Sequence, residues 1–239
     1  MSSEKLDYPK ASSLFLCLIE ETKLISDAGV IVYIGGFFLV IAFLSPYWIE
    51  SYDEAFINFK HMGLWTYCFD HFRFPRYQFD KLFDGCNNVF SEEYYVIREW
   101  LLPGWLLFLE LCMTLALILT LGTLVMIAAI LTRFPLRLVL KYEYFLSGAC
   151  FLATTISAFL IFLSVLIFPF NCWRRDWLMY PMFNHLSWSF YAAIVSALLH
   201  TYGAWYLYKE ARISYEKRRE SKNLVMQMYP PHERNFYEQ

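Results

Sequence analysis

The sequence predicts a mainly α-helical membrane protein in which a bundle of four transmembrane helices carries a small antiparallel β-sheet. Three observations indicate this fold class. The 239 residues are 58% hydrophobic, 21% aromatic and only 18% charged, which is too apolar for a soluble globular domain. The apolar residues are concentrated in four blocks, each long enough to cross a bilayer. One polar segment between these blocks is long enough to fold and contains two cysteines.

The four apolar blocks divide the whole chain into spans and connecting segments. The predicted spans are residues 28–48, 104–131, 144–170 and 185–208. The connecting segments are an N-terminal segment 1–27, a long loop 49–103, two short loops 132–143 and 171–184, and a tail 209–239. No cleavable signal peptide is predicted, because the first apolar block starts too late and is too long.

The spans contain few titratable groups. Glu110 is the one Asp, Glu, Lys or Arg in them. Charges inside a membrane are costly, and a structural role for Glu110, protonated or paired with a polar neighbour such as Thr114, is favoured over ion conduction. His185 is only the first residue of the last span, and His200 has no other histidine inside a span with which to share a metal or haem, so neither a metal nor a cofactor is predicted. Cys112 and Cys150 are interpreted as small packing residues.

Small residues at every fourth position predict close packing of the last two spans. They are Ala149, Ala153 and Ser157 in 144–170, and Ala193, Ala197 and Thr201 in 185–208. Such spacing lets helix backbones approach closely in lipid, where packing drives association. It favours one compact, left-handed bundle.

The distribution of Lys and Arg predicts the orientation. Of the 20 basic residues, 13 lie in segments 1–27, 132–143 and 209–239. The positive-inside tendency places these segments, with both termini, in the cytoplasm. Loops 49–103 and 171–184 then face outward. An interfacial helix is predicted over residues 12–26, and the tail beyond residue 222 lacks periodicity and is predicted to be disordered.

The long outward loop is predicted to form short strands followed by a helix. The strands, rich in aromatic and β-branched residues, are Ala55–Phe59, Leu64–Phe69 and Val89–Phe90. Asp84-Gly85 is a turn signal just before Cys86. Residues 91–101 are predicted to be helical, with Ser91 as N-cap. The second outward loop is too short for a domain and is interpreted as a hairpin-sized cap.

Cys68 and Cys86 face an oxidising compartment in this topology, so a disulfide between them is the default expectation. Closing a loop of this length stabilises a small domain by roughly 3 kcal/mol. Two alternatives stay open, namely two free thiols or the pairing of one cysteine with Cys172. Trp48 and Trp65 are expected at the membrane–water boundary, and Gly63 where the backbone closely approaches the membrane or a neighbouring strand.

Seven of these residues resemble a known signature. They are Trp48, Gly63, Leu64, Trp65, Cys68, Cys86 and Arg98, and their order is similar to the claudin superfamily pattern W…GLWxxC…C…R. The resemblance implies a left-handed four-helix bundle with an extracellular antiparallel sheet. It also implies that Cys68 and Cys86 form the disulfide of that sheet, and that Gly63-Leu64-Trp65 anchors the sheet near the bilayer.

Two departures refine the resemblance. The segment between the two cysteines is longer than in vertebrate claudins, and residues 236–239 lack the terminal Tyr-Val that binds PDZ scaffolds. The chain is most similar to insect claudin-like septate-junction proteins of the pasiflora type. The implied function is assembly of lateral junctions in the plasma membrane and sealing of the paracellular space. The implied partners are the protein itself, other junctional membrane proteins and the bilayer.

A second function class is an auxiliary subunit that modulates an ion channel or receptor, as calcium-channel gamma subunits do. An enzyme is not predicted, because the sequence contains no CxxC, HExxH, phosphate-loop or Ser/His/Asp grouping. The net charge of −2 indicates no nucleic-acid partner.

Aromatic residues crowd the segment between the two cysteines. They are Phe69, Phe72, Phe74, Tyr77, Phe79 and Phe83. Such a loop cannot bury all of these rings, so Phe72, Phe74, Tyr77 and Phe79 are predicted to form an exposed interaction surface. The alternative, that the rings pack on the sheet and on lipid headgroups, has about equal weight.

Overall fold

The structure is a computed structural model, and it describes all residues except 1–8, 53–57, 75–80, 176, 179 and 229–239. The side chains of residues 9–22, 138, 140 and 224–228 also lie outside the description. The elements in chain order are α1 (Pro9–Leu44), β1 (Ile49–Ser51), β2 (Phe59–Met62), β3 (Thr66–Arg73), β4 (Leu82–Asn88), α2 (Arg98–Leu101), α3 (Gly104–Thr132), α4 (Leu136–Cys172), the 3₁₀ helix η2 (Pro181–Phe183), β5 (Asn184–Leu186) and α5 (Trp188–Met228).

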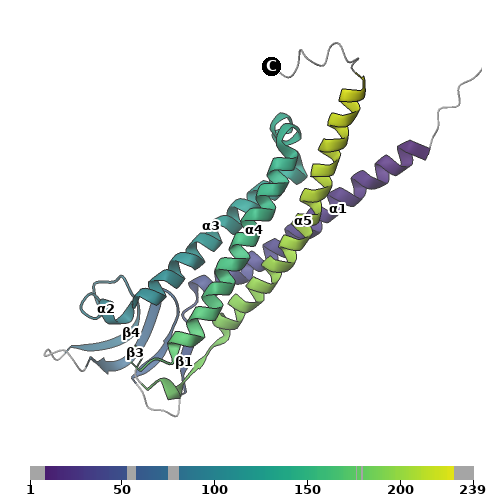
Figure 1. The fold of residues 1–239 in the computed structure, drawn as a ribbon. Helices are drawn as coiled ribbons and strands as arrows, with labels where there is room; N and C mark the ends of the chain where they lie inside the picture. Colours follow the sequence, from purple (N-terminus) through teal and green to yellow (C-terminus); the bar gives the residue numbers. More distant parts are fainter. Residues whose placement is uncertain (1–8, 53–57, 75–80, 176, 179, 229–239) are drawn as a thin grey trace, which may run out of the picture.

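Four long helices lie side by side and carry the β-sheet at one end (Figure 1). Helix α5 packs against α1 and α4, and α3 packs against α4 and α1, so the four form a closed bundle. The end with the sheet is called the sheet end here, and the other end, where α3 turns into α4, the opposite end. This arrangement confirms the predicted class of a helical bundle with a small antiparallel sheet.

Three segments of the described chain are long and apolar enough to cross a membrane. They are Lys23–Leu44, Gly104–Thr132 and Lys141–Cys172. The fourth predicted span, 185–208, lies mostly in the first half of α5 and is less apolar, because it contains polar residues such as Ser189, Ser196 and His200, all three of which are buried in the bundle. That α5 also spans the membrane therefore stays a prediction.

Small residues lie at the helix contacts, although not all of those predicted. Ala193 and Ala197 are buried, and the hydroxyl of buried Ser157 donates to the Ala116 carbonyl of α3 over 3.3 Å. Ala149 and Ala153 are only half-buried, and Thr201 is exposed. Of the predicted positions, Ser157, Ala193 and Ala197 therefore lie buried at contacts between helices.

The helices run further than the hydropathy pattern predicts. The interfacial helix expected over 12–26 is the first part of the continuous α1. The expected loop 132–143 shrinks to residues 133–135, because α4 begins at Leu136 and is only kinked at Tyr142. Helix α5 continues to Met228, past residue 222, where disorder was expected. Apolar blocks locate spans, whereas strong helix formers such as Lys, Arg, Glu and Ala extend them into water.

The sheet has the strand order β4-β3-β2-β1-β5, and every neighbouring pair is antiparallel. Strand β5 belongs to the second loop and pairs with β1, where Glu50 lies opposite His185. Both loops therefore build one sheet. The second loop is not the separate cap that its length suggested.

Strand bounds differ from the sequence prediction for local reasons. Residues 55–57 lie outside the described residues, and β2 begins at Phe59. Strand β3 begins at Thr66, after the Gly63-Leu64-Trp65 turn, and continues to Arg73. The Asp84-Gly85 signal marks no turn: Gly85, at φ +80°, lies inside β4 next to a bulge where β3 has one extra residue between Phe69 and Phe72.

The predicted helix 91–101 is mostly turns, and only Arg98–Leu101 is helical. Ser91 is not its N-cap, since the buried Ser91 hydroxyl has no hydrogen-bond partner among the described residues. Val89 and Phe90, predicted as a strand, lie just beyond the end of β4. The side chain of Arg98 holds this irregular segment in place.

Candidate functional site

The two cysteines of the long loop form a disulfide across the sheet. Cys68 on β3 lies directly opposite Cys86 on β4, with an S–S distance of 2.02 Å. Cys172, by contrast, is a free, buried thiol on α4. The predicted pairing is thus confirmed, and both alternatives, free thiols or a bond to Cys172, are wrong.

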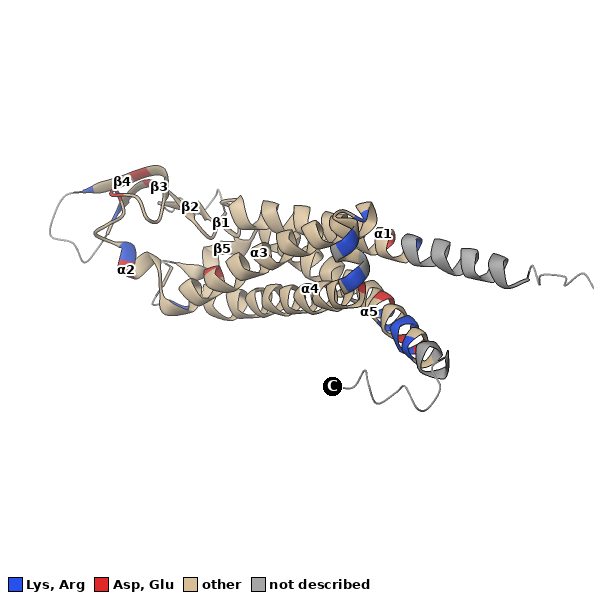
Figure 2. Ribbon diagram, turned by 90° about the horizontal axis from the view of Figure 1, so that it is seen from above, with Lys and Arg blue, Asp and Glu red and all other residues tan. Residues whose placement is uncertain are grey.

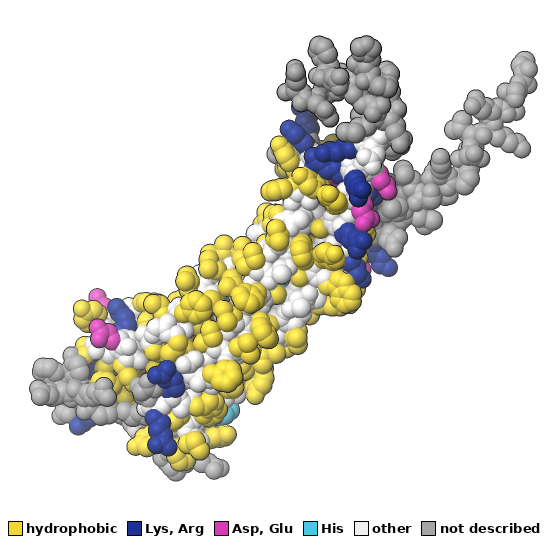
Figure 3. Space-filling view, in the orientation of Figure 1, with side chains coloured by type: hydrophobic (Ala, Val, Ile, Leu, Met, Phe, Trp, Pro, Cys, Tyr) yellow, Lys and Arg dark blue, Asp and Glu magenta, His cyan; other side chains and the backbone are white. Residues whose placement is uncertain are grey.

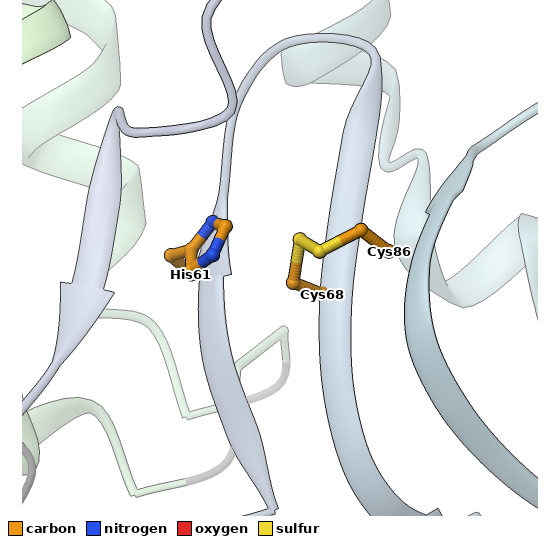
Figure 4. A group of neighbouring side chains, drawn as sticks. All are labelled: His61, Cys68 and Cys86. Carbon is orange, nitrogen blue, oxygen red and sulfur yellow. A yellow bond between two sulfur atoms is a disulfide. The ribbon is translucent and has the colours of Figure 1, made fainter.

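His61 extends the disulfide into a row of three side chains across three strands, because it lies opposite Cys68 on β2 (Figure 4). Its ring nitrogen and the two sulfurs lie within 4.8 Å of one another. Sulfurs in a disulfide have no thiolate to give to a metal. His61 instead holds the sheet: its Nδ1 lies 2.9 Å from the Pro46 carbonyl, and its ring stacks on Tyr47.

Gly63-Leu64-Trp65 attaches the sheet to the end of α1. A Cβ on Gly63 would lie 2.7 Å from Cα of Pro46 and would also overlap the carbonyl of Ser45. The close backbone approach predicted for Gly63 is thus present, and its neighbour is the segment that follows α1. Leu64 is fully buried, and the Trp65 ring packs edge-on against Phe43 of α1.

Trp48, predicted at the membrane–water boundary, faces the interior of the bundle. It is fully buried, and its indole N–H donates to the Ala42 carbonyl over 2.6 Å. Its ring contacts Phe168 of α4 and Phe190 of α5 edge-on. Trp48 therefore joins three helices directly below the sheet.

Arg98 organises the turns between β4 and α2. Its guanidinium donates to the backbone carbonyls of Val89, Phe90 and Ser91 over 3.0–3.1 Å. Carbonyls outside regular structure need such donors. This contact explains why an arginine stands just ahead of α3 in the motif.

A buried hydrogen-bonded hub joins the sheet to the helices. The Tyr67 hydroxyl and the Trp177 indole N–H both donate to the Leu101 carbonyl, over 2.6 and 3.2 Å. The Tyr94 hydroxyl donates to the Tyr67 carbonyl over 3.0 Å. Burial raises the pKa of Tyr67 well above its ordinary value, and the nearby carboxyl group of Glu110 raises it further. Sequence reasoning missed this hub, because nothing in the sequence pairs the first loop with Trp177.

In the segment between Cys68 and Cys86, the described aromatic rings pack into the core of the sheet. Phe69, Phe72 and Phe83 are all buried, and Phe72 stacks on Trp100. Phe74 is half-buried and also packs on Trp100. The predicted interaction surface is therefore wrong at Phe72, because α2 covers that face of the sheet. The remaining two members, Tyr77 and Phe79, lie outside the described residues.

Exposed apolar side chains gather instead on the second loop and the end of β1. Tyr180 is 63% exposed, Met182 80% and Phe183 49%, and Tyr52 on the neighbouring backbone is 52% exposed. The Tyr52 N–H donates to the Phe183 carbonyl over 3.0 Å, and the Tyr52 ring stacks on His185. The aromatic density of the sequence around Tyr180 could have indicated this surface.

The polar residues of the spans contact the bundle interior. Glu110 is 2% exposed, and the Thr114 hydroxyl donates to its backbone carbonyl, so Thr114 is not the partner of the Glu110 carboxylate. His200 is fully buried, with Nε2 3.0 Å from the Thr120 hydroxyl and Nδ1 2.8 Å from the Ser196 carbonyl. These contacts give His200 a packing role between α3 and α5.

The sheet is built from two loops, is clamped by a disulfide and lies at one end of a bundle of apolar helices. This architecture is that of a membrane protein with a folded lobe at one end of its helices. Over residues 33–208 the chain matches the family described as PMP-22/EMP/MP20/Claudin tight junction, and it belongs to this family. A comparison with curated proteins found no match. The chain is therefore a claudin-like membrane protein of tight-junction type, and this family consists of structural proteins and not enzymes.

Proposed function

We propose that this protein is a component of septate-type junctions, similar to the pasiflora proteins of insects, and that it helps to seal the space between epithelial cells. In this proposal all four long helices span the plasma membrane, the sheet lies outside the cell, and both termini lie in the cytoplasm. The excess of Lys and Arg in segments 1–27, 132–143 and 209–239 supports this orientation.

The observation that carries the proposal is the exposed apolar surface formed by Tyr52, Tyr180, Met182 and Phe183. Pairing of β5 with β1 and the contact between Tyr52 and Phe183 hold this surface in place. Exposed aromatic clusters on a fixed backbone are typical of protein interaction surfaces. We infer that it contacts another copy or another junctional membrane protein, beside it or across the cell–cell gap.

The test replaces Met182 and Phe183 with Ser in an epithelial layer that depends on this protein. We expect the variant to reach the cell surface but to lose its enrichment at cell contacts, so that a tracer dye crosses the layer. Leu82→Ser is the matched control, because Leu82 is also an exposed apolar residue of the sheet but lies on β4. Unchanged enrichment and dye exclusion in the double variant would count against the proposal.

The same cells test the second function class. An auxiliary subunit of a channel or receptor would co-purify with that one partner and would not form a belt at cell contacts. Co-purification of this kind, without a belt, would replace the junctional proposal.

A further inference from the structure

A group of exposed cations surrounds the opposite end of the bundle. Arg133, Arg137 and Lys141 lie on the α3–α4 turn and the start of α4, and Lys209 and Arg218 lie on α5. These five residues are called the basic collar here. Figure 2 shows Lys and Arg where α3 turns into α4 and along the far part of α5, where Asp and Glu stand among them, and Figure 3 shows both kinds of charge above the apolar flank of the bundle.

The collar residues differ from two lysines of the sheet end in whether they form ion pairs with acidic side chains. At the sheet end, Lys60 pairs with Asp70 at 3.1 Å and Lys81 with Glu93 at 3.2 Å. No collar residue forms an ion pair with an acid in the part of the chain that the structure describes. Ion pairs also occur at the opposite end, where Arg212 pairs with Glu216 at 3.1 Å, but the five collar residues make none with the described acids.

Three collar residues stand over aromatic rings. Arg218 of α5 lies 3.9 Å from the ring centre of Tyr144 on α4, Lys209 lies 4.7 Å from that of Trp205, and Lys141 lies 5.2 Å from that of Tyr142. A cation–π contact orders the side chain without cancelling its charge. The Arg218 contact also joins α5 to α4, so cations of both helices lie on one surface.

The surroundings of the collar place it at the level of lipid headgroups. Tyr142, Trp205 and Tyr208 are exposed close to its cations, and such residues concentrate at the membrane–water boundary. Phe134 and Leu136, on the turn next to Arg133 and Arg137, are 76% and 56% exposed, as apolar residues inserted beside headgroups would be.

We propose that the basic collar binds the phosphate groups of anionic phospholipids in the leaflet that surrounds the opposite end. The headgroups supply negative charge that these five cations do not obtain from ion pairs with described acids, and they bridge the α3–α4 turn to α5. Clusters of Lys and Arg next to a transmembrane helix bind phosphatidylserine and phosphoinositides in this way. The proposal does not depend on a junctional role.

The test uses the full chain reconstituted in vesicles of phosphatidylcholine, phosphatidylserine and a phosphatidylinositol bisphosphate, with native mass spectrometry to identify the lipids that stay bound. We expect the wild-type protein to retain anionic lipids in preference to phosphatidylcholine. Retention should fall steeply as the salt concentration rises, because the contacts are exposed charges. The triple variant Arg133→Gln/Arg137→Gln/Lys141→Gln should weaken retention about tenfold or more.

The matched control Lys60→Gln/Lys81→Gln/Arg175→Gln removes the same charge at the sheet end and should retain lipids as the wild type does. No anionic preference, insensitivity to salt, or an equal loss in both triple variants would overturn the proposal. Soluble inositol trisphosphate that displaces the lipid at equal concentration would also overturn it, because the ligand would then be free phosphate and not membrane lipid. The salt titration needs only the wild-type chain, so a variant that fails to fold leaves the proposal testable.

Discussion

At the residue scale, Gly63 shows how one missing side chain positions the whole sheet. Its torsion angles need no glycine, but the backbone of Ser45 and Pro46 occupies the space that a Cβ would need. Neither neighbour is a flexible side chain, so relief would require the sheet to shift away from α1. The requirement for glycine comes from contact between two segments and is therefore not visible in local propensity.

Gly63→Ala should consequently lower stability by about 1–3 kcal/mol, the usual cost of overpacking. The measurement is the midpoint of thermal unfolding of the purified protein in detergent. Gly122→Ala is the control, because nothing lies within 4 Å of a Cβ at that exposed position on α3. A control variant as unstable as Gly63→Ala would show that the sheet contact is not the cause.

The exposed pair of Asp70 and His71 makes the β3 bulge sensitive to pH. A hydrogen bond from His71, followed by the contacts with Lys60, lowers the pKa of Asp70 from 3.8. The hydrogen bond with Asp70, followed by the negative charges of Asp84 and Asp70, raises the pKa of His71 from 6.5. The contribution of Asp70 is lost as pH falls through its lowered pKa, and that of His71 is lost as pH rises through its raised pKa.

The pair should therefore stabilise the bulge fully between pH 3.8 and 6.5. His71→Asn is the variant that tests this, because Asn tolerates the left-handed φ of 51° at this position. Thermal midpoints should favour the wild type at about pH 5 and converge with the variant above the raised pKa of His71. A difference that does not change with pH would contradict the charged pairing.

At the element scale, the sheet is a joint product of both loops. Its disulfide could be predicted, because the compartment and the spacing of the two cysteines are enough to indicate the pairing. The pairing of β5 with β1 could not, since residues 184–186 are too short to show an alternating pattern and their partner lies more than a hundred positions earlier. Likewise, the segment between the two cysteines looked too aromatic to bury, because the ring of Trp100 that covers it belongs to α2, which lies outside that segment.

The disulfide should stabilise one part of this sheet more than the rest. Removing it in Cys68→Ser/Cys86→Ser loses roughly 3 kcal/mol in the chain-entropy model. Hydrogen exchange should then increase in β3 and β4, whereas β1 stays protected by its pairing with both β2 and β5. Cys172→Ser, a change at a free thiol, is the control. Exchange that rises equally in the helices would contradict a local role.

At the scale of the whole molecule, the apolar blocks predicted the bundle but not its helix ends or the membrane status of α5. Hydropathy detects the three most apolar segments and misses a helix whose polar residues point inward. In α5 the Ser196 hydroxyl donates to the Gly35 carbonyl over 2.9 Å, and His200 contacts Thr120. Polar groups that are satisfied inside the bundle do not prevent a helix from crossing lipid.

If α5 spans the membrane, the chain crosses an even number of times and both termini lie on one side. With Cys17 replaced by Ser, an impermeant maleimide should label Arg175→Cys, in the second loop, on intact cells. It should label Lys222→Cys, in the helical extension of α5, only after permeabilisation, as it should Arg133→Cys on the α3–α4 turn. Three crossings would instead place residue 222 on the same side as residue 175. Labelling of Lys222→Cys on intact cells would therefore show that α5 does not cross the membrane. Lys209 and Arg218 would then not belong to the basic collar.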